Sequence, residues 1–118
     1  MISKELLSLV LGLDVMAVCS EQGGKLKYCF DDSCGNLISR ESKINLDTLG
    51  RLCKEWCETQ DYNAFSCPKM VKAFAGCQLY YRWNDGTISD EMLFFEADTE
   101  LEAIVKATEF VVNEKGLL

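Results

Sequence analysis

The sequence predicts an α+β fold, a twisted antiparallel sheet with about three helices packed on one face. Of the 118 residues, 48% are hydrophobic and 26% are charged, a composition typical of one globular domain. Segments with helical periodicity alternate with groups of short strand-like segments, and no internal repeat or rhythm of parallel strands is present. The chain has one proline and no compositional break, so we expect residues 1–118 to form a single domain.

The first half of the chain begins with a helix and continues with antiparallel strands. Residues 3–11 have apolar side chains at helical spacing, with Ser3 as the N-cap and Gly12 after the last turn. Residues 15–19 and 25–30 are expected to pair as strands across a glycine turn. Turn residues fill 31–36, and a third strand opens at 37–40 and ends before Ile44.

The clearest helix of the middle region begins at Asn45 or Asp47 and ends near Gln60 and Asp61. Its apolar residues recur every three or four positions, which predicts one buried face. That face comprises Leu49, Leu52, Cys53 and Trp56.

Strands dominate the next region, and a helix closes the chain. Residues 62–67 alternate as a strand that Pro68 ends, while 70–75 fit either a strand or a helical turn. Asp85-Gly86 predicts a hairpin joining strands 77–83 and 92–96, with a wide loop at 89–90. A capping box at Thr99 begins the last helix, and Gly116 ends it. Its expected buried stripe is Leu101, Ile104, Val105, Thr108 and Val112.

The net charge is −7 and the pI is about 4.5. Such a chain does not attract phosphate backbones, so we expect no direct nucleic-acid binding and a basic partner instead. The sequence shows no secretory signal and no segment long enough to span a membrane. We therefore expect a location in the reducing cytoplasm, with the cysteines as thiols.

The chain has seven cysteines and no histidine, which excludes Cys-His catalysis. A zinc site built from the pairs Cys29/Cys34 and Cys53/Cys57 is one alternative, although no Cys-x-x-Cys occurs. A nucleophilic Cys67 beside Lys69 is another. We favour small apolar core residues for most of the cysteines, and expect no enzyme activity, metal or cofactor. Cys34, in a turn, and Cys57, at a helix edge, are the two thiols whose reactivity we would test.

Acidic and aromatic residues near the predicted hairpin suggest binding rather than catalysis. Asp31-Asp32 and Asp85 with Asp90 do not match a calcium loop, so we interpret them as turn residues. Tyrosine and tryptophan often anchor protein interfaces, although cross-strand packing is the simpler explanation for aromatic strands. The candidate interaction patch comprises Tyr81, Trp83, Asp85 and Phe94.

Three motifs recur in the same order in one group of proteins. They are the Ile-Ser-Lys-Glu-Leu-Leu-Ser helix ending at Leu-Gly, the Cys-Lys-Glu-Trp helix at residues 53–56, and the Asp-Thr-Glu-x-Glu-Ala helix at residues 98–103. The chain resembles small, uncharacterised proteins encoded in phages and prophages of proteobacteria. The resemblance spans nearly the whole chain and departs from the usual pattern around residues 62–90. Its motifs are structural, so it implies no functional residues.

These observations lead us to expect a small acidic phage or prophage accessory protein that binds a host or phage protein. One form of this function is to block a basic surface of a host defence or regulatory protein. The alternatives are a component of virion assembly and a cysteine-based metalloprotein or enzyme. The oligomeric state, including a small homo-oligomer, stays open at this point.

Overall fold

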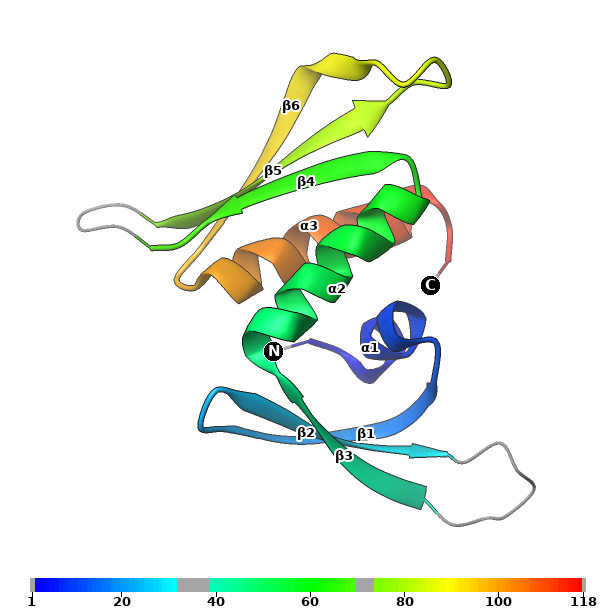
Figure 1. The fold of residues 1–118 in the computed structure, drawn as a ribbon, viewed down its shortest axis with the longest axis vertical. Coiled ribbons are helices and arrows are strands. Elements are labelled where there is room, and N and C mark those ends of the chain that lie inside the picture. Colours follow the sequence, from blue (N-terminus) through cyan, green and yellow to red (C-terminus); the bar gives the residue numbers. More distant parts are fainter. Residues whose placement is uncertain (1, 32–38, 70–73, 118) are drawn as a thin grey trace. The chain divides into compact units, whose positions relative to one another are not determined.

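A computed structural model describes residues 2–31, 39–69 and 74–117, and these form an α+β structure with three helices and two three-stranded antiparallel sheets (Figure 1). The prediction of an α+β fold is confirmed, but the prediction of one sheet is wrong. The chain divides into two compact units, Met1–Leu49 and Gly50–Leu118, each with its own sheet. A single domain over residues 1–118 stays a prediction.

The first unit contains helix α1 (Lys4–Leu11) and strands β1 (Asp14–Gln22), β2 (Lys25–Asp31) and β3 (Ser39–Asn45). The strands lie in the order β1-β2-β3, so β2 is central. The third strand was expected to end before Ile44, but it continues to Asn45 because Leu26 and Lys25 of β2 pair with those two residues. The predicted turn at 31–36, with Cys34, lies almost entirely outside the described residues.

The predicted boundaries of α1 are confirmed. The Ser3 hydroxyl accepts a hydrogen bond from the backbone N–H of Leu6 at 3.2 Å, as an N-cap does. Gly12 adopts φ = 67° and donates its N–H to the Ser8 carbonyl, which closes the helix. The Ser8 hydroxyl then accepts from the N–H of Val15 at 3.0 Å, which ties the end of α1 to the start of β1.

The hairpin between β1 and β2 turns at Gly23 and Gly24, which adopt φ = 60° and 74°. Two positive φ values in succession suit a tight hairpin turn and explain the glycine pair. The strand β1 is longer than its partner requires, so the register shifts twice, between Val15 and Ala17 and between Val18 and Ser20. Each shift is a bulge that leaves one residue of β1, Met16 or Cys19, without a partner in β2.

The second unit contains most of α2 (Leu46–Thr59), strands β4 (Tyr62–Cys67), β5 (Ala75–Arg82) and β6 (Ile88–Ala97), and α3 (Glu100–Glu114). The strand order is β4-β5-β6. Strand β6 begins at Ile88, so the expected loop at 89–90 is instead a shift of register between Tyr80 and Arg82. Residues 70–73, whose structure the sequence left open, lie outside the described residues.

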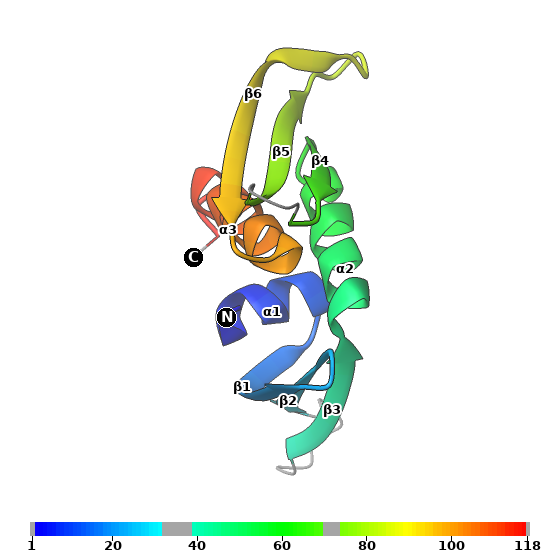
Figure 2. The same cartoon turned by 90° about the vertical axis from the view of Figure 1, so that its left-hand side faces the viewer.

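Helices α2 and α3 lie on the same side of the β4-β5-β6 sheet (Figure 2). The core between them contains Cys57 of α2, Leu79 of β5 and Val111 of α3, all fully buried. The rings of Tyr62 and Phe95 pack on Phe110 of α3, with centroid distances of 6.5 and 5.7 Å. The predicted buried stripe of α3 is confirmed except at Leu101, which is half-buried. On α2, Leu49 and Cys53 are buried, whereas Leu52 and Trp56 are half-buried.

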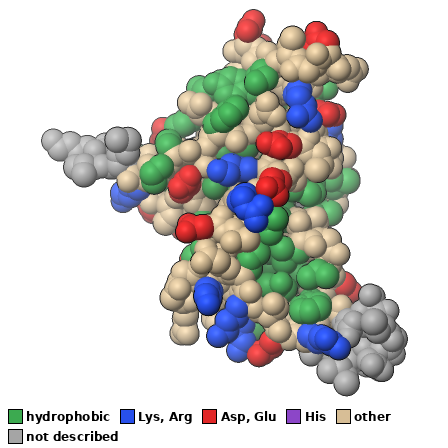
Figure 3. Space-filling model, in the orientation of Figure 1, with side chains coloured by type: hydrophobic (Ala, Val, Ile, Leu, Met, Phe, Trp, Pro, Cys, Tyr) green, Lys and Arg blue, Asp and Glu red, His purple; other side chains and the backbone are tan. Residues whose placement is uncertain are grey.

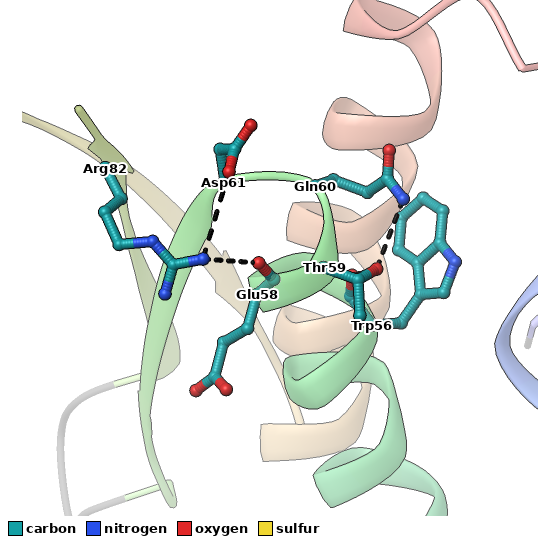
Figure 4. A network of polar contacts seen from close by, with 6 residues as sticks. All are labelled: Trp56, Glu58, Thr59, Gln60, Asp61 and Arg82. Atoms are coloured by element: carbon teal, nitrogen blue, oxygen red, sulfur yellow. Dashed lines mark hydrogen bonds and ion pairs between the residues drawn. The ribbon is translucent and has the colours of Figure 1, made fainter. Parts of the chain in front are cut away.

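The junction between α2 and β4 is stabilised by Arg82 of β5 (Figure 4). The Arg82 guanidinium donates to the Glu58 carbonyl at 2.8 Å and lies 3.9 Å from the Asp61 carboxylate. It thereby satisfies one of the carbonyls that a helix C-terminus leaves without a partner. Asp61 adopts φ = 67°, a conformation that non-glycine residues rarely take, and its carbonyl accepts from the N–H of Arg82.

Candidate functional site

The β4-β5-β6 sheet has two faces of different character, because alternate residues of a strand point to opposite sides. The register places Ala64, Leu79 and Leu93 side by side on the face that packs against the helices. The neighbouring row pairs Phe65 with Gln78 and Gln78 with Phe94, on the opposite face. We call that opposite side the outer face.

Four large side chains of the outer face form an apolar surface, which we call the outer-face cluster. Its members are Phe65, Tyr80, Met92 and Phe94. Phe65 is 52% exposed, Phe94 46% and Met92 45%, so all three keep about half of their surface in water. The Phe65 and Tyr80 rings meet edge to face with centroids 5.9 Å apart. In the second unit, α2 and α3 both lie on the other side of the sheet (Figure 2).

The Phe94 ring covers Gly76 on the neighbouring strand. A Cβ atom added at Gly76 would lie 2.5 Å from the Cζ atom of Phe94, closer than van der Waals contact allows. The missing side chain of Gly76 therefore lets the ring lie low over β5. Glu96 is the register partner of Gly76, so the contact between Phe94 and Gly76 lies at the edge of the outer-face cluster next to Glu96.

The structure brings together two of the four residues of the predicted patch. The rings of Tyr81 and Trp83 meet at 4.9 Å, and Tyr81 also touches Tyr62 at 5.5 Å, on the helix side of the sheet. Phe94 lies on the outer face instead. Asp85 lies in the hairpin turn, where its carboxylate accepts hydrogen bonds from the N–H and hydroxyl of Thr87, and these bonds lower its pKa.

Sequence reasoning missed Phe65 and Met92 as members of an apolar surface. The Asp-Gly hairpin indicated that β5 and β6 pair, but the shift of register between Tyr80 and Arg82 hides which residues face each other. Placing Phe65 beside Gln78 requires the β4-β5 pairing, whose connection has no such turn signal. The alternation of Phe65 with Ala64 and Ser66 was the one local hint.

The second unit carries most of the net negative charge of the chain. Residues 50–118 contain 12 of the 19 acidic residues and 7 of the 12 basic ones, and thus −5 of the net charge of −7. Among the described positions that the register assigns to this face, Glu96 and Arg82 are charged. Arg82 is already engaged, because its guanidinium donates to the Glu58 carbonyl and lies 3.9 Å from the Asp61 carboxylate. Figure 3 shows hydrophobic side chains together with both acidic and basic groups over this unit.

The cysteines fall into a buried group and an exposed group. Cys53, Cys57 and Cys77 are fully buried, and burial raises their pKa values to about 12, about 11 and about 12. Cys57, which the sequence placed at a helix edge, therefore belongs to the core, where its thiol donates to the Thr108 hydroxyl at 3.7 Å. The expectation that most of the cysteines are core residues is confirmed for Cys53 and Cys77, but three of the six described cysteines lie outside the core. Cys19 and Cys67 are exposed, and Cys29 is half-buried.

The described residues contain no cluster of three or more His, Cys, Asp or Glu side chains placed to hold a metal ion. An open hollow of about 280 Å³ lies at the junction of β6 and α3, lined by Glu96, Asp98, Glu102 and Lys106 among others. Lys106 donates to the Glu96 carbonyl at 2.8 Å, so the one cation of the hollow is already engaged. The carboxylates therefore make the hollow unfavourable for anionic ligands.

Within the described part of the chain, no helix has the length and apolar character required to cross a membrane. No protein-family model, curated protein or solved structure matches the chain.

Proposed function

We propose that the protein acts by binding another protein through the outer face of its β4-β5-β6 sheet. The outer-face cluster is the observation that carries this proposal. Large apolar side chains that are half in water on one sheet face are typical of a docking surface, whereas single exposed apolar residues are ordinary. The partner we propose is a basic protein of the host with defence or regulatory function, in the phage or prophage setting that the sequence resemblance implies.

The chemistry of the cluster suits a protein partner. Aromatic residues and methionine are enriched at the centres of interfaces, because they bury much area at a small cost in conformational entropy. Phe65, Tyr80 and Phe94 supply rings, and Met92 supplies a flexible side chain that adapts to the opposing surface. The strands hold these anchors on a regular hydrogen-bonded ladder, so little ordering is needed on binding.

The net charge of the chain distinguishes between two candidates for binding this face, a second copy of the chain and a basic protein. A second copy of the chain would bring another net charge of −7, with −5 of it in the same unit, and would be repelled. A partner with lysine or arginine around an apolar centre would be attracted and would meet Glu96 at the rim. The charge therefore favours a basic partner over self-association.

Affinity capture from host lysate, followed by mass spectrometry, tests the proposal when it is run with matched variants. The double variant Met92→Ser/Phe94→Ser removes two anchors, and Met16→Ser removes an apolar side chain of β1 that is 52% exposed. Two lost anchors should reduce capture of the specific partner by roughly tenfold or more, which corresponds to about 1.4 kcal/mol. Met16→Ser should capture it as the wild type does. Equal capture by all three proteins would show that the outer face is not the docking surface.

A charge-reversal arm separates the electrostatic part of the proposal from the apolar part. Glu96→Lys lies at the rim of the cluster, and Glu21→Lys makes the same change of charge on β1 of the first unit. We expect Glu96→Lys to slow association and Glu21→Lys to have a smaller effect, with both differences reduced at high salt. Light scattering over a range of concentrations is the complementary measurement. A dimer that Phe94→Ser abolishes would contradict the basic partner and assign the face to a second copy.

A further inference from the structure

Two thiols meet on the sheet of the first unit. The Sγ atoms of Cys19 and Cys29 lie 3.4 Å apart, and both cysteines are free. A disulfide requires a separation of about 2.05 Å, so a further approach of less than 1.5 Å, within the reach of side-chain rotation, would join them. The pair is on the surface, since Cys19 is exposed and Cys29 is half-buried.

The two cysteines meet where the pairing of β1 with β2 is irregular. Ser20 pairs with Lys27 and Val18 pairs with Tyr28, so Cys19 is the extra residue between these two pairs. Ala17 is the register partner of Cys29, and Cys19 lies two residues after Ala17 along β1. The two thiols therefore lie on the same face of the sheet. The bulge leaves Cys19 without a partner in β2, and its Sγ atom lies against that of Cys29.

A lysine and a glutamate lie beside the two thiols. Lys27 lies near both sulfur atoms and is itself paired with Glu41 at 3.1 Å. The hydrogen bond with Cys19, followed by burial, raises the pKa of Cys29. Cys19 is the more exposed sulfur, so it is the one that an incoming reagent reaches first.

We propose that Cys19 and Cys29 form a reversible dithiol–disulfide modification site, which a small-molecule disulfide such as glutathione disulfide oxidises. The Cys19 thiolate attacks one sulfur of glutathione disulfide, which forms a mixed disulfide and releases one glutathione thiolate. The Cys29 thiolate then attacks the Cys19 sulfur, which forms the Cys19–Cys29 bond and releases the second glutathione. The two cysteine thiols together lose two protons and two electrons, and glutathione disulfide is reduced to two glutathione molecules.

The test is equilibration of the full chain in mixtures of reduced and oxidised glutathione, followed by acid quenching and non-reducing peptide mapping. A Cys34→Ser/Cys67→Ser background removes two further candidate thiols from the measurement. We expect a cross-linked peptide that contains Cys19 and Cys29, a mass loss of two hydrogens, and full return to the dithiol with excess reduced glutathione. In Cys29→Ser, glutathione on Cys19 should exceed the wild-type level by at least about tenfold, because the neighbouring thiol that resolves the mixed disulfide is missing.

The peptide map of the unsubstituted pair tests the proposal even if a variant folds poorly, and circular dichroism checks that Cys29→Ser keeps its structure. Glutathione retained on Cys19 to the same extent with and without Cys29 would overturn the proposal. A cross-link that joins Cys19 or Cys29 to a different cysteine would also overturn it. The buried Cys53, Cys57 and Cys77 serve as internal controls and should stay unmodified in the folded protein.

Discussion

Alkaline conditions should destabilise the protein through its three buried thiols. Cys53, Cys57 and Cys77 are protonated in the folded state up to pKa values of about 12, about 11 and about 12, against an ordinary value of 9.0. In the unfolded chain the thiols ionise near that ordinary value, so above it the unfolded state binds fewer protons than the folded state. The stabilisation is complete below the unfolded pKa and is lost as the pH rises toward the folded pKa.

The size of the effect follows from linkage. Each thiol that ionises only on unfolding costs about 1.4 kcal/mol of stability per pH unit above the unfolded pKa. Between about pH 8 and about pH 10 one such thiol accounts for roughly 1.4 kcal/mol, and three account for roughly 4 kcal/mol. A domain of ordinary stability unfolds with about 5–15 kcal/mol, so this loss would be a large fraction of the total.

The assay is urea unfolding at both pH values, followed by tryptophan fluorescence, since Trp56 and Trp83 both lie in the second unit. Cys77→Ala should lose about a third of the pH dependence, about 1.4 kcal/mol. Val111→Ala is the matched control, because it truncates the same core without removing an ionisable group. Relative to the wild type, the free energy of unfolding of Val111→Ala should be lower by a similar amount at both pH values. The reasoning is refuted if Cys77→Ala and the wild type lose the same free energy of unfolding between the two pH values.

Two further predictions concern the core and the end of α2. Leu79→Ala should lower the free energy of unfolding by roughly 3–5 kcal/mol, because it leaves a cavity at a fully buried site. If residues 1–118 fold as one domain, Leu26→Ala should lower the same calorimetric transition, and two separate transitions would contradict that expectation. Asp61→Gly should raise the stability by roughly 0.5–1 kcal/mol in urea unfolding, since the left-handed backbone costs more than the exposed contact to Arg82 contributes. A lower stability would show that the Arg82 contact is worth more than the strain.

Sequence reasoning predicted local structure well where the signal lies within a few residues. The caps at Ser3 and Thr99 set the starts of α1 and α3, and their hydroxyls accept from Leu6 and Glu102 as expected. These signals are local because a cap satisfies backbone groups of the next turn. The number of sheets was predicted wrongly, because strand pairing joins distant segments and no residue marks which hairpins share a ladder.

The candidate site was harder to predict than the fold for the same reason. Sequence reasoning placed Cys19 in a strand and favoured the core for most of the cysteines, but this thiol lies on the surface. The bulge at Met16 moves the residues after it to the opposite face relative to Val15, and no distinctive residue marks that bulge. The outer-face cluster combines residues of three strands, and the sequence identified Phe94 without Phe65 or Met92. Cys57 lies one turn beyond Cys53 on α2 and is buried against Thr108 of α3. The periodicity of α2 alone carries no information about this contact with a distant helix.

The Phe94 ring above Gly76 also has an evolutionary consequence. With a Cβ of residue 76 only 2.5 Å from the Phe94 ring, any side chain at position 76 requires the ring to move away from β5. Any relative that keeps an aromatic residue at position 94 should keep glycine at 76, and alanine or serine at 76 should appear together with a small residue at 94. The residues at positions 76 and 94 therefore indicate whether a relative keeps the aromatic ring packed over β5 at this edge of the outer-face cluster.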